Sequence, residues 1–368
     1  MNAGIENPNL LGFPQAALVD YFAGIGEKPF RAGQLLKWMH QRNASSFEVM
    51  TDLSRDLRAQ LARTATIALP QVISEQVSRD GTVKWLFESG AGQAVETVFI
   101  PEPARGTLCI SSQVGCALNC AFCATGAQGF NRNLTAAEII GQVTHANRIL
   151  PQRESGESAV TNVVFMGMGE PLANYRNTLP ALDLLLSDYA YGLSRRRITV
   201  STSGIVPHIH KLGDDCNVSL AVSLHAPNDE LRDRLVPVNK VHPIAELLDA
   251  CWQYAAKRAN RFITFEYVML RDVNDSLQHA DQLTDLLQHH PAKVNLIPFN
   301  PFSGNDFRRS SRPVIEQFQN RLRQRGLVAT TRKTRGDDID AACGQLAGKV
   351  SDRIRVRMGT RNLKVASA

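Results

Sequence analysis

The sequence predicts an α/β protein, a partial (β/α)6 barrel of the TIM type with a small N-terminal helical domain and a β-rich connector before it. From residue 107 onward, six short apolar runs alternate with helix-length segments, which is typical of βα units around a parallel sheet. Before that point, apolar residues recur at helical spacing over residues 14–64 and at strand-like spacing over 71–100. A closed barrel would need eight units, so six predict a partial barrel.

The N-terminal elements come first. Short amphipathic helices are expected in the first 70 residues, one of them running from Phe30 to His40. Three strands should follow, at 71–78, 82–89 and 93–100, with Asp80-Gly81 as a hairpin signal between the first two. The predicted domains are therefore the helical domain 1–70, the connector 71–104, the barrel 105–335 and a C-terminal segment 336–368.

The barrel strands are predicted at 107–112, 161–166, 197–202, 217–223, 262–270 and 293–298. The helix between the first two, over 135–150, opens with a capping box, because Glu138 stands three residues after Thr135. In barrels of parallel strands the active site lies at the C-terminal ends of the strands. Functional side chains are therefore expected just after these runs.

Composition narrows the class of protein. The chain has 368 residues, 43% of them hydrophobic and 21% charged, which is ordinary for a globular protein. No apolar stretch approaches 18 residues and the first basic residue is Lys28, so we expect a cytoplasmic protein with neither a signal peptide nor a membrane span. Seven cysteines, an odd number with three crowded together, do not resemble a secreted disulfide framework.

The crowded cysteines are Cys116, Cys120 and Cys123, spaced C-x3-C-x2-C just after the first barrel strand. Thiolates hold iron–sulfur clusters, and three ligands for a four-iron cluster leave one iron open for chemistry. A buried helical stripe and a structural zinc site are the alternatives, but zinc usually takes four ligands. Gly115 and Gly126 bracket the run and favour a loop over a helix interior.

Polar residues follow the other predicted strands. Gly169 and Glu170 lie in a glycine-rich turn after the second strand, where glycine allows close backbone approach to a ligand and the carboxylate suits an amino group. At the ends of later strands stand Ser201, Ser223, Leu224, His225 and Asn300. Each alone is more typical of an ordinary loop; together they surround the predicted barrel mouth.

Two further cysteines stand out. Cys109 lies in the first barrel strand, and Cys343 lies in a polar, glycine-flanked segment expected to be an exposed, mobile loop where a thiolate can act as a nucleophile. Cys216 and Cys251 are expected to be buried apolar residues. From residue 305 to the end, 15 Lys and Arg stand against 6 Asp and Glu, so a polyanionic partner is expected.

With these motifs, the chain closely resembles the RlmN family, bacterial radical S-adenosylmethionine (SAM) methyltransferases that act on adenine carbon 2 in 23S ribosomal RNA and certain tRNAs. The resemblance runs nearly end to end. It is carried by FRAGQLLKWMHQ, VETVFIP, RGTLCISSQVGCALNCAFCATGAQGFNRNL, VVFMGMGEPLANY, ITVSTSG, VSLHAPND, NLIPFNPF and GDDIDAACGQLAG.

The resemblance implies a radical SAM barrel holding one 4Fe-4S cluster on Cys116, Cys120 and Cys123. It implies two SAM molecules per turnover, one as methyl donor and one as radical source. The residues implied to bind SAM are the strand-end residues Gly169, Glu170, Ser201, Ser223, Leu224, His225 and Asn300. The implied partners are 23S rRNA, tRNA and an electron donor such as flavodoxin or ferredoxin, for a monomeric protein with no membrane partner.

The resemblance also implies three catalytic roles. Cys343 takes a methyl group from SAM; a radical then removes a hydrogen from that methyl group, and the resulting carbon radical adds to carbon 2. Glu96 takes the proton from carbon 2. Cys109 then attacks Cys343, and a disulfide forms as the product leaves. Three alternatives stay open: the related carbon-8 methyltransferase of the resistance type, a non-catalytic RNA-binding protein with a structural metal site, and a radical SAM enzyme acting on a protein or small molecule.

Overall fold

The computed structural model describes residues 7–153, 156, 158–258, 262–342, 344–348 and 350. Cys343 and the last 18 residues, with their five arginines and lysines, lie outside the described residues. None of the helices in the described part of the chain combines the length and the apolar character needed to cross a membrane.

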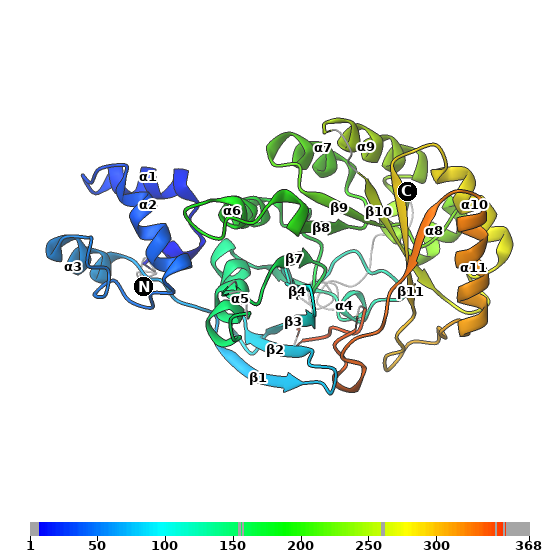
Figure 1. Ribbon diagram of the computed structural model, residues 1–368, viewed down its shortest axis with the longest axis horizontal. Coiled ribbons are helices and arrows are strands. Elements are labelled where there is room, and N and C mark those ends of the chain that lie inside the picture. The colour runs from blue at the N-terminus through cyan, green and yellow to red at the C-terminus, as the bar shows by residue number, and fades with distance from the viewer. Residues whose placement is uncertain are drawn as a thin grey trace, which may run out of the picture.

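The N-terminal helices α1 to α3 lie together at one side of the molecule, opposite the side that carries α10 (Leu277–Leu287) and α11 (Arg312–Gln324) (Figure 1). Their amphipathic spacing buries one face, and the Ser54 hydroxyl caps the third helix by accepting from the Leu57 amide at 3.2 Å. The predicted run from Phe30 to His40 forms a helix that continues into a wider π turn. The elements are η1 (Leu10–Gly12), α1 (Gln15–Gly24), α2 (Arg31–Leu36), η2 (Lys37–Gln41) and α3 (Arg55–Thr64).

One ten-stranded sheet runs through the rest of the molecule in the order β1-β2-β3-β4-β7-β8-β9-β10-β11-β12. Its first four strands pair antiparallel, and they are β1 (Val72–Val77), β2 (Val83–Glu88), β3 (Ala94–Glu102) and β4 (Arg105–Cys109). The three predicted connector strands are thus confirmed. Gly81, at φ +81°, turns the chain between β1 and β2, as the hairpin signal predicts.

From β4 onward the strands are parallel: β7 (Asn162–Phe165), β8 (Ile198–Thr202), β9 (Ser219–Ser223), β10 (Ile263–Met269), β11 (Ala292–Pro298) and β12 (Val328–Thr331). The six predicted barrel strands are confirmed. A seventh parallel strand, β12, was not predicted; it pairs with β11 at the open edge of the sheet, where only one neighbour holds it.

Helices cover the outside of the parallel strands (Figure 1). The predicted capping box of α5 is present, since the Thr135 hydroxyl accepts from the Glu138 amide and the Glu138 carboxylate accepts from the Thr135 amide. The helices are α5 (Ala136–Ile149), α6 (Tyr175–Leu186), α7 (Val206–Asp215), α8 (Asp229–Leu235), α9 (Ile244–Ala256), α10 (Leu277–Leu287) and α11 (Arg312–Gln324), with short 3-10 turns η3 (Arg195–Arg197), η4 (Pro237–Lys240) and η5 (Asp337–Ile339).

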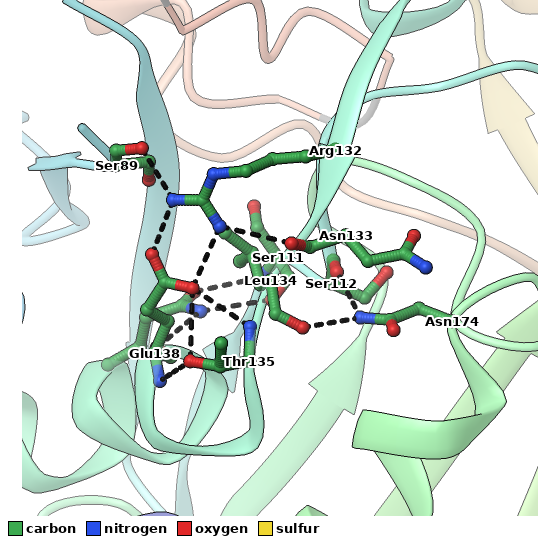
Figure 2. A network of polar contacts seen from close by, with 10 residues as sticks. Ser89, Ser111, Ser112, Arg132, Asn133, Leu134, Thr135, Glu138 and Asn174 are labelled. Atoms are coloured by element: carbon green, nitrogen blue, oxygen red, sulfur yellow. Dashed lines mark hydrogen bonds and ion pairs between the residues drawn. The ribbon is translucent and has the colours of Figure 1, made fainter. Parts of the chain in front are cut away.

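The cysteine run lies inside a separate small hairpin made by β5 (Gln113–Gly115) and β6 (Phe130–Asn133), with the short helix α4 (Ala124–Ala127) between them. Figure 2 shows how this hairpin is fixed to the barrel. The Arg132 guanidinium bonds the Glu138 carboxylate and the Ser89 carbonyl, and the Asn174 amide donates to the Ser112 and Leu134 carbonyls at 2.8 Å each. The first turn of α5 therefore holds β6, and Asn174, the residue before α6, holds both ends of the hairpin.

Candidate active site

The main cavity lies at the C-terminal ends of the parallel strands, where the sequence predicts it. All three cysteines of the run border it. So do six of the seven residues predicted to bind a cofactor: Gly169, Glu170, Ser201, Ser223, His225 and Asn300. The seventh, Leu224, has a fully buried side chain and does not line the cavity.

The cysteine run is a loop, as its flanking glycines predict, and Asn119 takes a left-handed conformation at φ +52°. Backbone bonds fix its position: Cys116 N donates to Gly129 O at 2.8 Å and Ala121 N to Leu235 O at 3.0 Å. The Cys120 thiol lies 3.8 Å from the Ser203 hydroxyl. Burial raises the pKa of Cys120 to about 12 and that of Cys116 well above its usual range, so metal binding must displace their protons.

The donor set fits a cluster better than a single ion. In the described part of the chain, no three Cys, His, Asp or Glu side chains converge closely enough to hold one metal ion. Three cysteines that border one cavity would suit a four-iron cluster, whose cysteine ligands are farther apart than those of a single zinc ion.

The turn after β7 brings Glu170 into the cavity. Gly169 needs to be glycine, because it sits at φ +95° and a Cβ there would lie 2.5 Å from the Gln113 Cβ. The Glu170 carboxylate accepts from Ser203 N at 2.8 Å and from Leu172 N at 3.1 Å. Burial nevertheless raises the pKa of Glu170 to about 7, and the backbone donors oppose that rise. A buried carboxylate held in this way suits a cationic or hydrogen-bond-donating ligand group.

His225 fixes the loop after β9 against the cysteine loop. Its backbone is left-handed at φ +60°, its Nδ1 accepts from Val268 N at 3.0 Å, and its ring packs edge-on against Phe122 with centroids 4.4 Å apart. Burial, with the nearby Arg232 charge, lowers the pKa of His225 to about 3, so the imidazole is neutral. With Nδ1 accepting, the remaining N–H is on Nε2.

A second, smaller cavity adjoins the first and shares Met166, Asn300 and Arg332 with it. Cys109 lines this second cavity, as do Arg332, Lys333, Arg335, Ala341 and Ala342. Cys109 stands opposite Val98 in the β3–β4 ladder, so the two side chains share one face of the sheet.

Glu96 lies on β3, two residues before Val98, and therefore points to the same face as Val98 and Cys109. It borders neither cavity. Its Oε2 accepts from Ala347 N at 2.9 Å, and its Oε1 lies 3.2 Å from Lys84 Nζ. Glu96 thus contacts the segment that carries Cys343.

Cys343 itself lies outside the described residues, so its predicted role stays a prediction. The neighbouring Ala341, Ala342 and Leu346 are buried, whereas the sequence suggested an exposed loop. Their burial follows from docking: Thr125 Oγ1 donates to Leu346 O at 2.5 Å. Gly344 lines the first cavity and Ala342 the second.

Two buried charged residues, Arg232 and Glu266, belong to the site but were not predicted from the sequence. Arg232 on α8 is fully buried and donates to the carbonyls of Ser203, Ser223 and Leu224, three residues of the cavity-lining loops. Glu266 on β10 lines the main cavity, and its Oε2 accepts from the Asn295 amide at 2.7 Å. Glu266 sits within an apolar run, and a charged residue in a predicted buried strand was the signal that could have identified it.

Some basic residues of the C-terminal region form contacts with other parts of the protein. Arg321 and Arg325 both pair with Asp281, and Arg309 donates to Asn300 Oδ1 at 2.7 Å. These arginines attach α11 and its preceding loop to the barrel. Lys333 is exposed, and with Arg332 and Arg335 it places basic charge beside the Cys109 cavity.

A partial parallel barrel with three loop cysteines at its mouth, followed by a glycine-rich turn that buries a glutamate, defines a radical SAM enzyme. Residues 110–283 match the radical SAM superfamily. Residues 8–67 match a family described as the ribosomal RNA large subunit methyltransferase N-terminal domain. The second of these matches covers the N-terminal helices, and the first covers most of the parallel strands.

Among solved structures, the chain is similar to a radical SAM methyltransferase from Sphaerobacter thermophilus, with 45% identity over 92% of this chain and 99% of that one and a TM-score of 0.86. The chain belongs to the RlmN family of radical SAM methyltransferases. A weaker likeness, 14% identity and a TM-score of 0.44 over 64% of this chain and 55% of that one, is to SuiB of Streptococcus suis bound to S-adenosylmethionine; it is too slight to add to the assignment.

Proposed function

We propose that this protein methylates carbon 2 of an adenine in 23S ribosomal RNA, and of tRNA as a second substrate, by way of a methyl group carried on Cys343. The observation that carries the proposal is the pair of adjoining cavities. The first holds the cysteine run and Glu170, and the second holds Cys109. Gly344 borders the first and Ala342 the second, so the chain on either side of Cys343 reaches both.

The reaction needs a radical because carbon 2 of adenine, between two ring nitrogens, is electron-poor and does not displace a methyl group from SAM. Cys116, Cys120 and Cys123 would hold a four-iron cluster, which together with SAM would supply an oxidant strong enough to remove a hydrogen atom from a methyl group. The protein's own part is to hold the methyl carrier, a base and a resolving thiol around the target carbon.

Cys343 acts first. Its thiolate displaces the methyl group of one SAM, so that a sulfur–carbon bond forms and S-adenosylhomocysteine leaves. Once that methyl carbon has lost a hydrogen atom and bonded to carbon 2, Glu96 takes the proton of carbon 2; the bound cluster would accept the electron released. Cys109 then attacks the Cys343 sulfur, a disulfide forms, and the released carbon keeps the electron pair and takes a proton.

The positions of Glu96 and Cys109 support these roles. Both point to the same face of β3 and β4, where Ala341 and Ala342 border the cavity lined by Cys109 and Ala347 donates to Glu96. Recognition of RNA favours bases turned out of loops, and a base that reacts in a recessed site must leave its stack. Arg332, Lys333 and Arg335 border the second cavity and suit the phosphates of such a nucleotide.

The experiment is an anaerobic single-turnover reaction of the cluster-containing protein with methyl-labelled SAM, a reductant and an RNA substrate. Mass spectrometry should find the label on Cys343, and Cys343→Ala should lose methylation while keeping its cluster. Cys109→Ala should accumulate a covalent protein–RNA adduct. Clean release of methylated RNA by Cys109→Ala would remove the resolving role, and 8-methyladenosine as the product would move the target to carbon 8.

A further inference from the structure

We propose that Lys84 is a positioning residue for the proton transfer to Glu96: it holds the Glu96 carboxylate against the segment that carries Cys343. The inference rests on the proposed function, in which Glu96 is the base. Lys84 lies on β2, outside both cavities, and no sequence motif singled it out.

The contact is direct and largely shielded from water. Lys84 Nζ lies 3.2 Å from Glu96 Oε1, and the two side chains are 10% and 12% exposed. In the β2–β3 ladder Lys84 stands opposite Val98, so Glu96 is its diagonal neighbour on the same face. An ammonium in so buried a place loses most of its hydration, and the Glu96 carboxylate is the partner that compensates.

The same ion pair also reaches the chain on both sides of Cys343. Lys84 Nζ donates to Asp340 O at 3.4 Å, and Glu96 Oε2 accepts from Ala347 N at 2.9 Å. Asp340 is three residues before Cys343 and Ala347 four residues after it. The lysine and the glutamate therefore tie the methyl-carrying segment to β2 and β3 at two points.

Other bonds already dock this segment without Lys84. Ser78 Oγ donates to Asp338 Oδ1 at 2.5 Å, Ala124 N donates to Gly344 O at 2.9 Å, and Thr125 bonds Leu346. Docking alone thus does not require a buried ammonium at position 84. Among the described residues, the cation paired with Glu96 Oε1 is Lys84, which fixes the orientation of the carboxylate and leaves a lone pair of each oxygen available.

If Lys84 positions Glu96 in this way, its replacement should affect one step, the resolution of the protein–RNA adduct. Methyl transfer from SAM to Cys343 uses neither Lys84 nor Glu96, whereas resolution of the protein–RNA adduct needs the proton of carbon 2 to reach Glu96. Replacing Lys84 should therefore slow adduct resolution and leave Cys343 methylation at its normal rate.

The test compares Lys84→Met, Lys84→Gln and Lys84→Arg in the cluster-containing protein, with Lys211→Met as the matched control. Lys211 pairs with Asp215 on the surface of α7, with a side chain 53% exposed. Single-turnover reactions are quenched at intervals, and the methyl on Cys343, the adduct and 2-methyladenosine are each quantified. We expect wild-type Cys343 methylation, adduct that decays at least tenfold more slowly in Lys84→Met and Lys84→Gln, and substantial rescue in Lys84→Arg.

Each other outcome has a definite meaning. Adduct decay at the wild-type rate in both neutral variants overturns the inference, and so does loss of Cys343 methylation in variants that keep their circular dichroism and iron content, because Lys84 would then serve docking alone. If the wild-type protein itself forms neither methylated Cys343 nor adduct, the proposed function fails, whatever the Lys84 variants do.

Discussion

At the scale of residues, a single buried guanidinium joins the loops around the main cavity. Arg232 is fully buried, and besides its three carbonyl partners it donates to Asn239 Oδ1 at 2.7 Å. Asn239 in turn donates to Asp229 and Asp233, so two carboxylates lie behind the guanidinium. Burial lowers the pKa of Arg232 to about 10, and the residue remains charged at neutral pH.

Arg232→Met should cost about 3 kcal/mol of unfolding free energy, because one buried and two partly buried carbonyls lose this donor and each unmet group costs roughly 1–3 kcal/mol. Arg232→Lys should recover only part, since an ammonium lacks the planar fork that reaches separate carbonyls. Denaturant unfolding of the metal-free protein measures both. A loss under 1 kcal/mol in Arg232→Met would show that these loops do not depend on it.

The predictable site residues share a local signal. The cysteine run has a recognisable spacing, and Glu170, Ser201 and Ser223 each follow an apolar run that ends in a turn. Lys84 and Arg232 carry no such signal, because their contacts join strands and loops far apart in the chain. Pairing of Lys84 with Glu96, for example, depends on the register of two antiparallel strands.

At the scale of elements, the spacing of apolar residues and the positions of turn-forming residues predicted nine of the ten strands of the large sheet. The missed strand, β12, is four residues long and has alternating exposure, so it lacks the continuous apolar run of a buried parallel strand. It nevertheless matters, because Arg332 and Lys333 follow it directly and border the second cavity.

The N-terminal helices meet the barrel through a buried histidine. His40 is 5% exposed, and its Nδ1 lies 3.2 Å from the Tyr191 hydroxyl. Burial, with the nearby Arg148 charge, lowers the pKa of His40 from 6.5 to about 3. Between these values the unfolded chain binds a proton that the folded protein does not. The stability linked to His40 is therefore complete above about pH 6.5 and falls as the pH drops toward 3.

Acidification from pH 7.5 to 5.5 should lower the unfolding free energy of the wild type more than that of His40→Phe. The expected difference is about 1 kcal/mol, because one proton contributes at most ~1.4 kcal/mol per pH unit. Denaturant unfolding at both values measures it, and His289→Asn, at an exposed position, serves as the control. Equal losses in wild type and His40→Phe would contradict the buried neutral state of His40.

At the scale of the whole molecule, one sheet carries Lys84, Glu96 and Cys109 and also the strands that end at the main cavity. The antiparallel strands β2 to β4 carry Lys84, Glu96 and Cys109, and the parallel strands that follow carry the cavity of the cysteine run. Among the described basic residues of the C-terminal region, Arg321 and Arg325 attach α11 to the barrel, whereas Arg332, Lys333 and Arg335 border the second cavity. Composition predicted the surplus of positive charge, whereas the fold shows which basic residues belong to each of these two groups.

This division predicts which basic residues bind RNA. Lys333→Met should weaken RNA binding and lower the dependence of log affinity on log salt by about one, as expected for a lost phosphate contact. Arg312→Met should change neither, since Arg312 is 90% exposed on α11 and pairs with Glu316. Fluorescence anisotropy over a salt series measures both. Equal effects of the two substitutions would mean that only net charge matters.

The most direct test is mass spectrometry of RNA after anaerobic incubation with the cluster-containing protein, a reductant and SAM. The proposed function predicts 2-methyladenosine in 23S ribosomal RNA with wild-type protein, and none with Cys343→Ala. Finding 8-methyladenosine, or no methylated adenosine while SAM is being cleaved, would contradict it.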